Sequence, residues 1–202
     1  PYPPIGVGLA SRRIGIFGGT FDPPHHGHLI VATEAADALG AEQLIFVPAG
    51  VPPHRTVGPL ASADQRLRML RAAIAGEPRF LVDDLELKRE GPSYTVDTLR
   101  ELLLRYSDAE LVFLLGIDQF RDLSTWREPD EIARLATLAV MEREGETLPD
   151  DTPYQAVEVE VPRIDISSTE IRARAAEGAS IRYFVPDAVR EIIEREGLYR
   201  TL

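Results

Sequence analysis

The sequence predicts an α/β protein in which helices cover both faces of a mostly parallel sheet. Two observations lead to this fold class. Short apolar runs typical of buried strands alternate along the chain with apolar residues at helical spacing. The early strands are each followed by a helix, as in a parallel sheet. At 202 residues with 44% apolar content, the chain is long enough to bury one core. We expect one domain over residues 12–202 after a flexible N-terminal tail at residues 1–11, with ligands at the carboxyl ends of the strands.

Apolar spacing and helix caps define the individual elements. Short β-branched or continuously apolar runs predict strands at 13–17, 43–47, 110–115 and 138–141, and two further apolar pieces lie at 80–82 and 85–87. Apolar residues three and four positions apart predict helices at 27–39, at 62–75, from a cap at Ser93 to about 106, from a cap at Ser167, and between 186 and 197.

Composition and charge exclude several classes of function. The chain carries 33 acidic and 22 basic residues, a net charge of −11, which opposes binding of an extended nucleic acid. A small phosphorylated substrate is compatible with this charge, because a few donors in one cleft set the local potential. The chain has no cysteine, so disulfides and thiol chemistry are excluded, and no run approaches the ~18 apolar residues of a membrane span. We expect a cytoplasmic protein whose opening residues are no signal peptide.

Glycines and histidines fill the segment between the first predicted strand and the first predicted helix. Gly18 and Gly19 let the backbone approach a phosphate, and the helix start supplies N–H donors. His25 and His28 are candidates to donate to phosphate oxygens and, when protonated, to offset developing charge. Two alternatives stay open: a glycine turn with solvated histidines, and zinc ligation by the two histidines, which no Cys or His-Glu-x-x-His pattern supports.

A second candidate phosphate site begins the predicted helix near residue 167. Ser167 and Glu170 have the spacing of a capping box. The hydroxyls of Ser167, Ser168 and Thr169 and the N–H groups of a new helix suit phosphate oxygens, and Arg172 offers a planar fork one turn later. A purely structural cap is the alternative interpretation.

Together these segments resemble the two phosphate-binding signatures of the nucleotidylyltransferase superfamily. The (His/Thr)-x-Gly-His signature matches residues 25–28, and the second signature matches residues 166–172. Three further segments, at 48–55 (PAGVPPHR), 93–99 (SYTVDTL) and 115–126 (LGIDQF through the single tryptophan), narrow the resemblance to bacterial nicotinate-nucleotide adenylyltransferases. The resemblance implies a Rossmann-like nucleotidyltransferase fold.

The resemblance also implies a reaction and its site residues. The family condenses nicotinate mononucleotide with ATP to give deamido-NAD and pyrophosphate in NAD biosynthesis, by direct in-line attack on the α-phosphate. Mg²⁺ is implied as a cofactor that ATP phosphates hold, without metal ligands from protein side chains. The implied catalytic residues are His25, His28 and Arg172. The implied ATP-binding residues are Gly18, Gly19, Thr20, Phe21, His25, His28, Gly116, Asp118, Ile166, Ser167, Ser168, Thr169 and Arg172. The implied residues for nicotinate mononucleotide are Asp22, His54, Arg55, Tyr94, Thr95, Asp118, Trp126 and Arg143.

Four of these residues have a definite expected contact. The resemblance implies that Trp126 stacks on the pyridine ring, that the N–H groups of Tyr94 and Thr95 receive the nicotinate carboxylate, and that Asp118 accepts hydrogen bonds from ribose hydroxyls. The structural alternatives are a core or rim indole at Trp126, a simple helix cap at Ser93 and an exposed aspartate at a helix start for Asp118.

Several rival functions stay open at this point. Pantetheine-phosphate adenylyltransferases and cytidylyltransferases share the first and last signatures, and the segments 93–95 and 116–126 distinguish them. A non-catalytic nucleotide-binding module and a fragment of a class I aminoacyl-tRNA synthetase are rivals of other classes. ATP and nicotinate mononucleotide are the expected partners, nucleic acid and membranes are not, and a homo-oligomer is left open.

Overall fold

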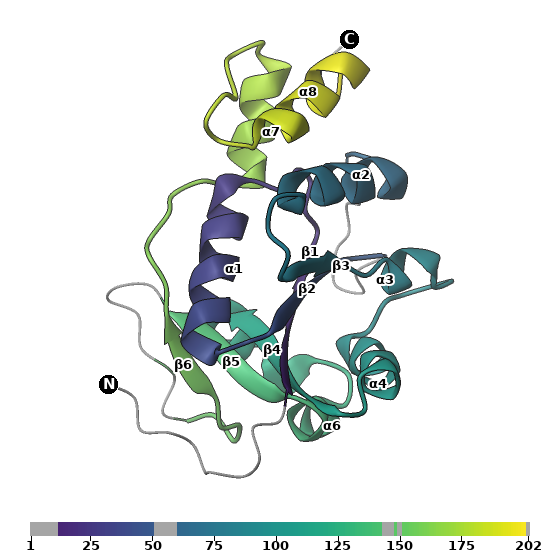
Figure 1. Ribbon diagram of the computed structural model, residues 1–202, viewed down its shortest axis with the longest axis vertical. Helices are drawn as coiled ribbons and strands as arrows, with labels where there is room; N and C mark the ends of the chain where they lie inside the picture. The colour runs from purple at the N-terminus through teal and green to yellow at the C-terminus, as the bar shows by residue number, and fades with distance from the viewer. Residues whose placement is uncertain (1–11, 51–59, 143–147, 149–150, 201–202) are drawn as a thin grey trace.

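The fold is built on one six-stranded sheet in which every pairing is parallel (Figure 1). The computed structural model describes residues 12–50, 60–142, 148 and 151–200. The strand order is β3-β2-β1-β4-β5-β6. The chain therefore adds β2 and β3 on one side of β1 and then β4, β5 and β6 on the other side. A ligand crevice is expected between β1 and β4, where the strand order changes direction. The strands are β1 (Arg12–Gly19), β2 (Gln43–Pro48), β3 (Phe80–Val82), β4 (Ala109–Gly116), β5 (Thr137–Glu142) and β6 (Val157–Glu160).

Helices cover both faces of this sheet, which confirms the predicted fold class. The helices are α1 (His26–Leu39), α2 (Ala63–Ile74), α3 (Leu85–Lys88), α4 (Thr95–Arg105), α5 (Ile117–Arg121), the 3-10 helix η1 (Leu123–Thr125), α6 (Pro129–Leu135), α7 (Ser168–Ala176) and α8 (Asp187–Glu196). Apolar residues of α1 and α2 pack on one face, and those of α4 and α6 pack on the other.

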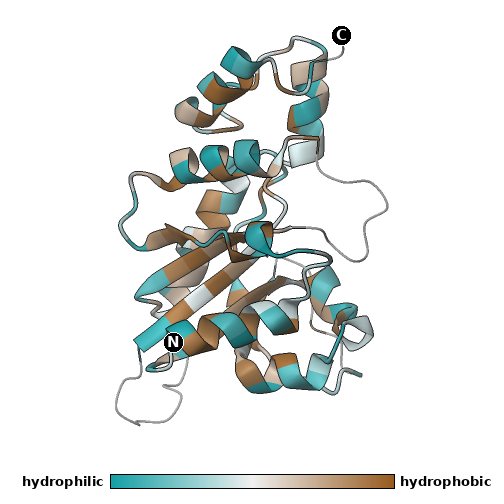
Figure 2. Cartoon of the chain, turned by 90° about the vertical axis from the view of Figure 1, so that its right-hand side faces the viewer, coloured by the Kyte–Doolittle hydropathy of each residue, from teal (hydrophilic) through white to brown (hydrophobic). Residues whose placement is uncertain are grey.

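The central strand β4 shows why its sequence is continuously apolar. Leu111, Phe113 and Leu115 belong to the core under α4 and α6, whereas Val112 and Leu114 belong to the core under α1. Successive side chains of a strand point to opposite faces, so a strand covered on both sides has no polar face. Figure 2 shows the same arrangement, with hydrophobic colour along the strands and hydrophilic colour on the outward faces of the helices.

The last two helices form a third apolar cluster beyond the sheet. Ile171 of α7 and Val189 and Ile192 of α8 pack with Met69 of α2, and α7 and α8 stand together beyond α2 in Figure 1. Gly197 ends α8 at φ 61°, a left-handed cap that favours glycine. This packing fixes the start of α7 relative to the sheet.

The structure adds short elements that the sequence analysis missed. The apolar pieces at 80–82 and 85–87 form a strand and a one-turn helix, and α5, η1, α6 and β6 were not predicted. In β6 only Val159 is buried, which leaves too few apolar residues for a strand signal. Among the residues that the structure describes, no helix has both the length and the apolar character needed to cross a membrane.

The packing of α4 on the sheet can be tested with two leucines of that helix. The side chain of Leu102 is fully buried, whereas Leu104 is 83% exposed. We expect Leu102→Ala to lower the free energy of unfolding by about 2–5 kcal/mol, because the cavity it leaves is only partly filled by relaxation. Leu104→Ala is the matched control and should change it by less than about 0.5 kcal/mol. Urea unfolding of both variants measures the difference, and equal effects would contradict the packing.

Candidate functional site

The loop from β1 to α1 is shaped by a glycine and a phenylalanine. Phe21 has a left-handed φ of 49°, and its ring is buried against Phe17 and Phe46. A Cβ on Gly19 would lie 2.8 Å from that ring, so only glycine fits there. The Phe21 side chain is therefore part of the core, and any contact of this residue with ATP has to come from its backbone.

His25 and His28 cap the start of α1 in a reciprocal arrangement. The backbone N–H of His28 donates to Nδ1 of His25 at 3.3 Å, and the backbone N–H of His25 donates to Nδ1 of His28 at 3.2 Å. The two rings stack with their centroids 3.6 Å apart. A Cβ on Gly27 would lie 3.0 Å from Nδ1 of His25, which accounts for the glycine of this signature. Because both Nδ1 atoms accept hydrogen bonds, each neutral ring carries its proton on Nε2.

Burial keeps both histidines neutral. Burial, with a smaller effect of His26, lowers the pKa of His25 to about 4. Burial, with a smaller effect of His25, holds the pKa of His28 well below its usual value. Near neutral pH the ligand-free protein therefore presents two Nε2–H donors rather than the imidazolium charge considered from the sequence.

The segment at 166–172 contacts the loop between β1 and α1, as predicted from the sequence. Ser167 caps α7 by accepting a hydrogen bond from the N–H of Glu170 at 3.1 Å. Ser168 Oγ donates to the carbonyl of Pro23 at 2.9 Å across 145 positions of sequence. Arg172 Nη1 donates to the carbonyl of Asp22 at 2.8 Å. The juxtaposition of the two predicted phosphate segments is thus confirmed.

Two of the predicted binding residues already have protein partners. Arg172 donates through Nη2 to Thr169 Oγ1 at 3.1 Å in addition to its bond to the loop. The Asp22 carboxylate, in a residue only 4% exposed, accepts hydrogen bonds from the N–H groups of Leu60 and Ala61 at 2.8 and 3.2 Å and from Tyr199 Oη at 2.7 Å. Burial and the bond to Asp22 raise the pKa of Tyr199. Asp22 therefore anchors the loop with its carboxylate, and its contact with the mononucleotide stays a prediction.

Arg66 of α2 holds the same loop and was not singled out from the sequence. It is 2% exposed, and it donates to the carbonyl of Thr20 at 2.8 Å and to that of Ala49 at 2.9 Å. It thereby ties the end of β1 to the end of β2. Its position three and four residues before the buried Met69 and Leu70 was the signal available in the sequence, because an arginine on an apolar helix face needs buried partners.

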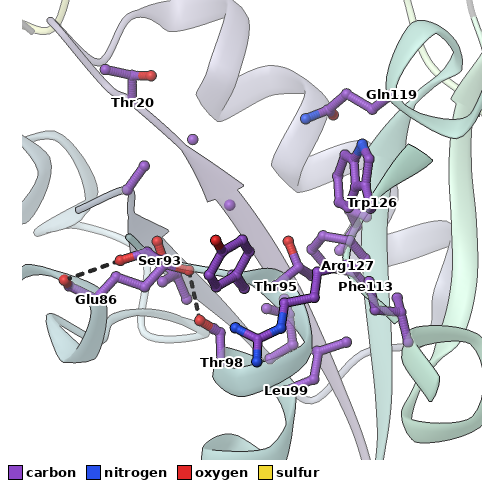
Figure 3. Close-up of a pocket in the computed structure, with 18 residues that line it drawn as sticks. Thr20, Glu86, Ser93, Thr95, Thr98, Leu99, Phe113, Gln119, Trp126 and Arg127 are labelled. Atoms are coloured by element: carbon purple, nitrogen blue, oxygen red, sulfur yellow. Dashed lines mark hydrogen bonds between the residues drawn. The ribbon is translucent and has the colours of Figure 1, made fainter. Parts of the chain in front are cut away.

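A cavity of about 400 Å³ opens at the carboxyl ends of the central strands (Figure 3). The predicted residues that line it are Gly18, Gly19, Thr20, Tyr94, Thr95 and Trp126, and unpredicted lining residues include Ala49, Glu86, Thr98, Gln119 and Arg127. In Figure 3 the Trp126 and Gln119 side chains lie on one side and Glu86 and Ser93 on the other. The volume and the mixed apolar and polar lining are typical of a small-ligand site.

Trp126 and the start of α4 frame one end of the cavity. The indole packs edge-on against Phe113 with centroids 6.3 Å apart. Tyr94, rather than the predicted Ser93, is the N-cap of α4, and its side chain makes no capping bond. Ser93 Oγ donates instead to the carbonyl of Glu86 at 3.4 Å. The first N–H groups of α4 therefore lack a side-chain cap, which suits an anionic group.

Glu86 is a buried carboxyl group on the opposite side. It accepts hydrogen bonds from Thr98 Oγ1 at 2.7 Å and from the N–H of Gly50 at 3.4 Å. Burial raises the pKa of Glu86. A Cβ on Gly50 would lie 2.4 Å from the Glu86 carbonyl oxygen, so the chain passes as close to α3 as glycine allows. Glu86 thus links Gly50, where the described part of the chain after β2 ends, to Thr98 of α4.

The remaining predicted residues lie in several places. Gly116 caps α5 and donates to Gln119 Oε1 at 3.0 Å. The Asp118 side chain is 91% exposed, pairs with Arg121 at 3.3 Å and does not line the cavity. Ile166 packs with the third apolar cluster. His54, Arg55 and Arg143 lie outside the described residues, as does the tail at 1–11.

No further observation supports zinc binding by His25 and His28. Within residues 12–50, 60–142, 148 and 151–200, no three histidine, aspartate or glutamate side chains come together as a metal site requires. Both histidines of the pair use one ring nitrogen for the backbone of α1. The arrangement is that of two neutral donors at a helix start.

Comparison with known proteins assigns the family. The model of the cytidylyltransferase-like family matches residues 16–174. A probable nicotinate-nucleotide adenylyltransferase of Geobacillus thermodenitrificans is 49% identical over 93% of this chain and 86% of its own length, and one of Thermus thermophilus is 48% identical over 93% of this chain and 100% of its own. The chain belongs to this family. The prediction drawn from the five sequence segments is therefore confirmed.

Solved structures agree with the fold. Nicotinic acid mononucleotide adenylyltransferase of Plasmodium falciparum, complexed with NaAD, has a TM-score of 0.75 at 20% identity, with 93% of this chain and 97% of that chain covered. A putative nicotinate-nucleotide adenylyltransferase of Vibrio parahaemolyticus has a TM-score of 0.69 at 24% identity, with 95% and 97% covered. At these identities the likeness supports the arrangement of sheet and helices alone.

The neutral state of His25 predicts how stability depends on pH. Its folded pKa of about 4 lies below the ordinary 6.5, so between these values the unfolded chain binds more protons. The free energy of unfolding therefore falls as the pH is lowered from 6.5 towards 4. For such a histidine the loss is about 1.4 kcal/mol per pH unit. In His25→Asn the amide oxygen keeps the cap but does not titrate. We expect urea unfolding between pH 6.5 and 5 to show a shallower pH dependence in the variant; an unchanged slope would contradict the assignment.

Proposed function

We propose that the chain transfers the adenylyl group of ATP to nicotinate mononucleotide, giving deamido-NAD and pyrophosphate in NAD biosynthesis. The observation that carries the proposal is the meeting of two donor-rich segments beside a cavity at the carboxyl edge of the sheet. One segment begins α1 with His25 and His28, and the other begins α7 with Ser167 and Ser168. Family membership supports the same reaction.

The two substrates divide the site between them. The triphosphate of ATP lies between the start of α1 and the start of α7, which supply N–H groups, hydroxyls and two Nε2–H groups. The mononucleotide occupies the cavity, with its pyridine ring on Trp126 and its carboxylate at the N–H groups of Tyr94 and Thr95. Asp118, His54, Arg55 and Arg143 complete the proposed contacts of the mononucleotide.

Chemistry at this site needs no protein nucleophile. An oxygen of the mononucleotide 5′-phosphate, which is ionised at neutral pH, attacks the α-phosphorus of ATP. A new phosphorus–oxygen bond forms, the bond from the α-phosphorus to the oxygen that bridges to the β-phosphorus breaks, and pyrophosphate leaves with that electron pair. The protein aligns the two anions and stabilises the charge that builds on pyrophosphate.

The histidines act as fixed donors in this scheme. Their rings are held by each other and by the backbone, so the Nε2–H groups need little reorganisation when charge develops. Bound Mg²⁺ would offset part of the charge on the ATP phosphates, and we assign it no ligand from the protein side chains. Arg172 supports the site by keeping the β1–α1 loop at the start of α7.

Pyrophosphate release with separate acceptors tests the reaction. The assay supplies ATP and Mg²⁺ with nicotinate mononucleotide, nicotinamide mononucleotide or phosphopantetheine. We expect release with nicotinate mononucleotide, accompanied by deamido-NAD. Preference for phosphopantetheine would assign the chain to a different transferase, and absence of release with every acceptor would make it a binding module.

The role of His28 can be tested without disturbing its cap. In His28→Asn the amide oxygen replaces Nδ1 as acceptor of the His25 N–H, but the Nε2–H is lost. We expect kcat to fall on the order of 10²-fold, because a donor to the developing charge is removed. Arg134→Gln, at an exposed ion pair with Glu131 on α6, is the control. Normal turnover of a folded His28→Asn variant would exclude the proposed role.

A further inference from the structure

We propose that the guanidinium group of Arg127 selects the acid form of the mononucleotide by pairing with the carboxylate on its pyridine ring. This inference rests on the proposed function and adds a specificity-determining side chain to it. The amide form of the same mononucleotide lacks that negative charge.

Arg127 lies where such a carboxylate has to arrive. It lines the cavity directly after Trp126, and both side chains project from the segment between η1 and α6 (Figure 3). Its guanidinium carbon lies 4.6 Å from the centroid of the Tyr94 ring, and Tyr94 is the N-cap of α4. A pyridine ring stacked on Trp126 therefore has Arg127 and the start of α4 as its neighbours.

The charges around the cavity leave this role to one residue. Among the lining residues that the structure describes, Arg127 is the cation and Glu86 is the carboxyl group. The ionised form of Glu86 would repel a second carboxylate, and its hydrogen bonds to Thr98 and Gly50 hold it in place. A carboxylate that enters this cavity consequently gains most from the guanidinium.

The present ion pairs of Arg127 are long and exposed. Its nitrogens lie 3.9 Å from Asp97 and 3.6 Å from Glu128, and its side chain is 52% exposed. Pairs of this kind contribute about 0–1 kcal/mol. Arg100 also pairs with both acids, at 3.4 Å to Asp97 and 2.6 Å to Glu128. Arg127 can therefore exchange these partners for a substrate carboxylate at little cost.

The test compares the acid and amide mononucleotides in two variants and a control. Arg127→Gln keeps a planar polar group but removes the charge, Arg127→Lys keeps the charge, and Arg134→Gln removes a surface arginine outside the cavity. We expect Arg127→Gln to lower kcat/KM for the acid about ten-fold relative to the amide, through a higher KM for the acid. The KM for ATP should not change, Arg127→Lys should keep part of the preference, and Arg134→Gln should behave as the unaltered chain.

The outcome separates selectivity from structural support. If Arg127 only held the Tyr94 ring, or if it bound the 5′-phosphate, Arg127→Gln would weaken the acid and the amide equally. An unchanged ratio of the two kcat/KM values would therefore overturn the inference while leaving the adenylyltransferase function intact.

A binding measurement keeps the inference independent of turnover. Trp126 is the single tryptophan of the chain, so its fluorescence reports a ring that stacks on it. Titration without ATP should show tighter binding of the acid than of the amide, with the preference lost in Arg127→Gln. If pyrophosphate release failed but this preference held, the proposed reaction would be wrong and the inference would stand. Equal or absent binding of both mononucleotides would overturn the inference.

Discussion

The hydrogen bonds that hold residues 20–23 are the constraint on which the rest of the site depends. Arg66 donates to the carbonyl of Thr20, Arg172 to that of Asp22 and Ser168 to that of Pro23, while Tyr199 donates to the Asp22 carboxylate. Buried carbonyls of an irregular loop need such donors, because no neighbouring strand supplies them. The donors come from α2, α7 and the end of the chain, so the loop adopts its form only when the C-terminal helices have packed against the sheet. The histidine pair, which follows the loop directly, takes its position from the same contacts.

The sheet explains why backbone donors are gathered at this point. Each parallel strand ends at the same edge, and the helices that follow expose N–H groups there. The stacked histidines add two Nε2–H donors while burial keeps them uncharged. In a chain with a net charge of −11, these local dipoles are the groups that favour an anion, because the overall field opposes it.

The strands and helices with dense apolar patterns could be predicted, and those that depend on distant contacts could not. The run in β4 is apolar because both faces are covered, and that pattern is visible in the sequence. The one turn of α3 has a single buried residue, Leu85, so packing rather than local pattern decides it. Among site residues, Trp126 and Thr95 were identified by resemblance. Arg66 was missed because its acceptors lie 17 and 46 positions away, and the inward turn of Asp22 depends on Tyr199, which is 177 positions away.

The two ends of the site differ in the groups that they offer to an anion. The starts of α1 and α7 offer directional N–H, hydroxyl and Nε2–H donors. A carboxylate on a pyridine ring arrives without a counter-ion, and the helix start at Thr95 offers only partial charge. Full charge has to come from the chain, and in our proposal Arg127 supplies it beside Trp126. Because the acid and the amide have nearly the same shape, discrimination between them rests on charge rather than on fit. A single half-exposed guanidinium also allows release of the product, which retains the same carboxylate, since solvent screens the pair as the ring leaves.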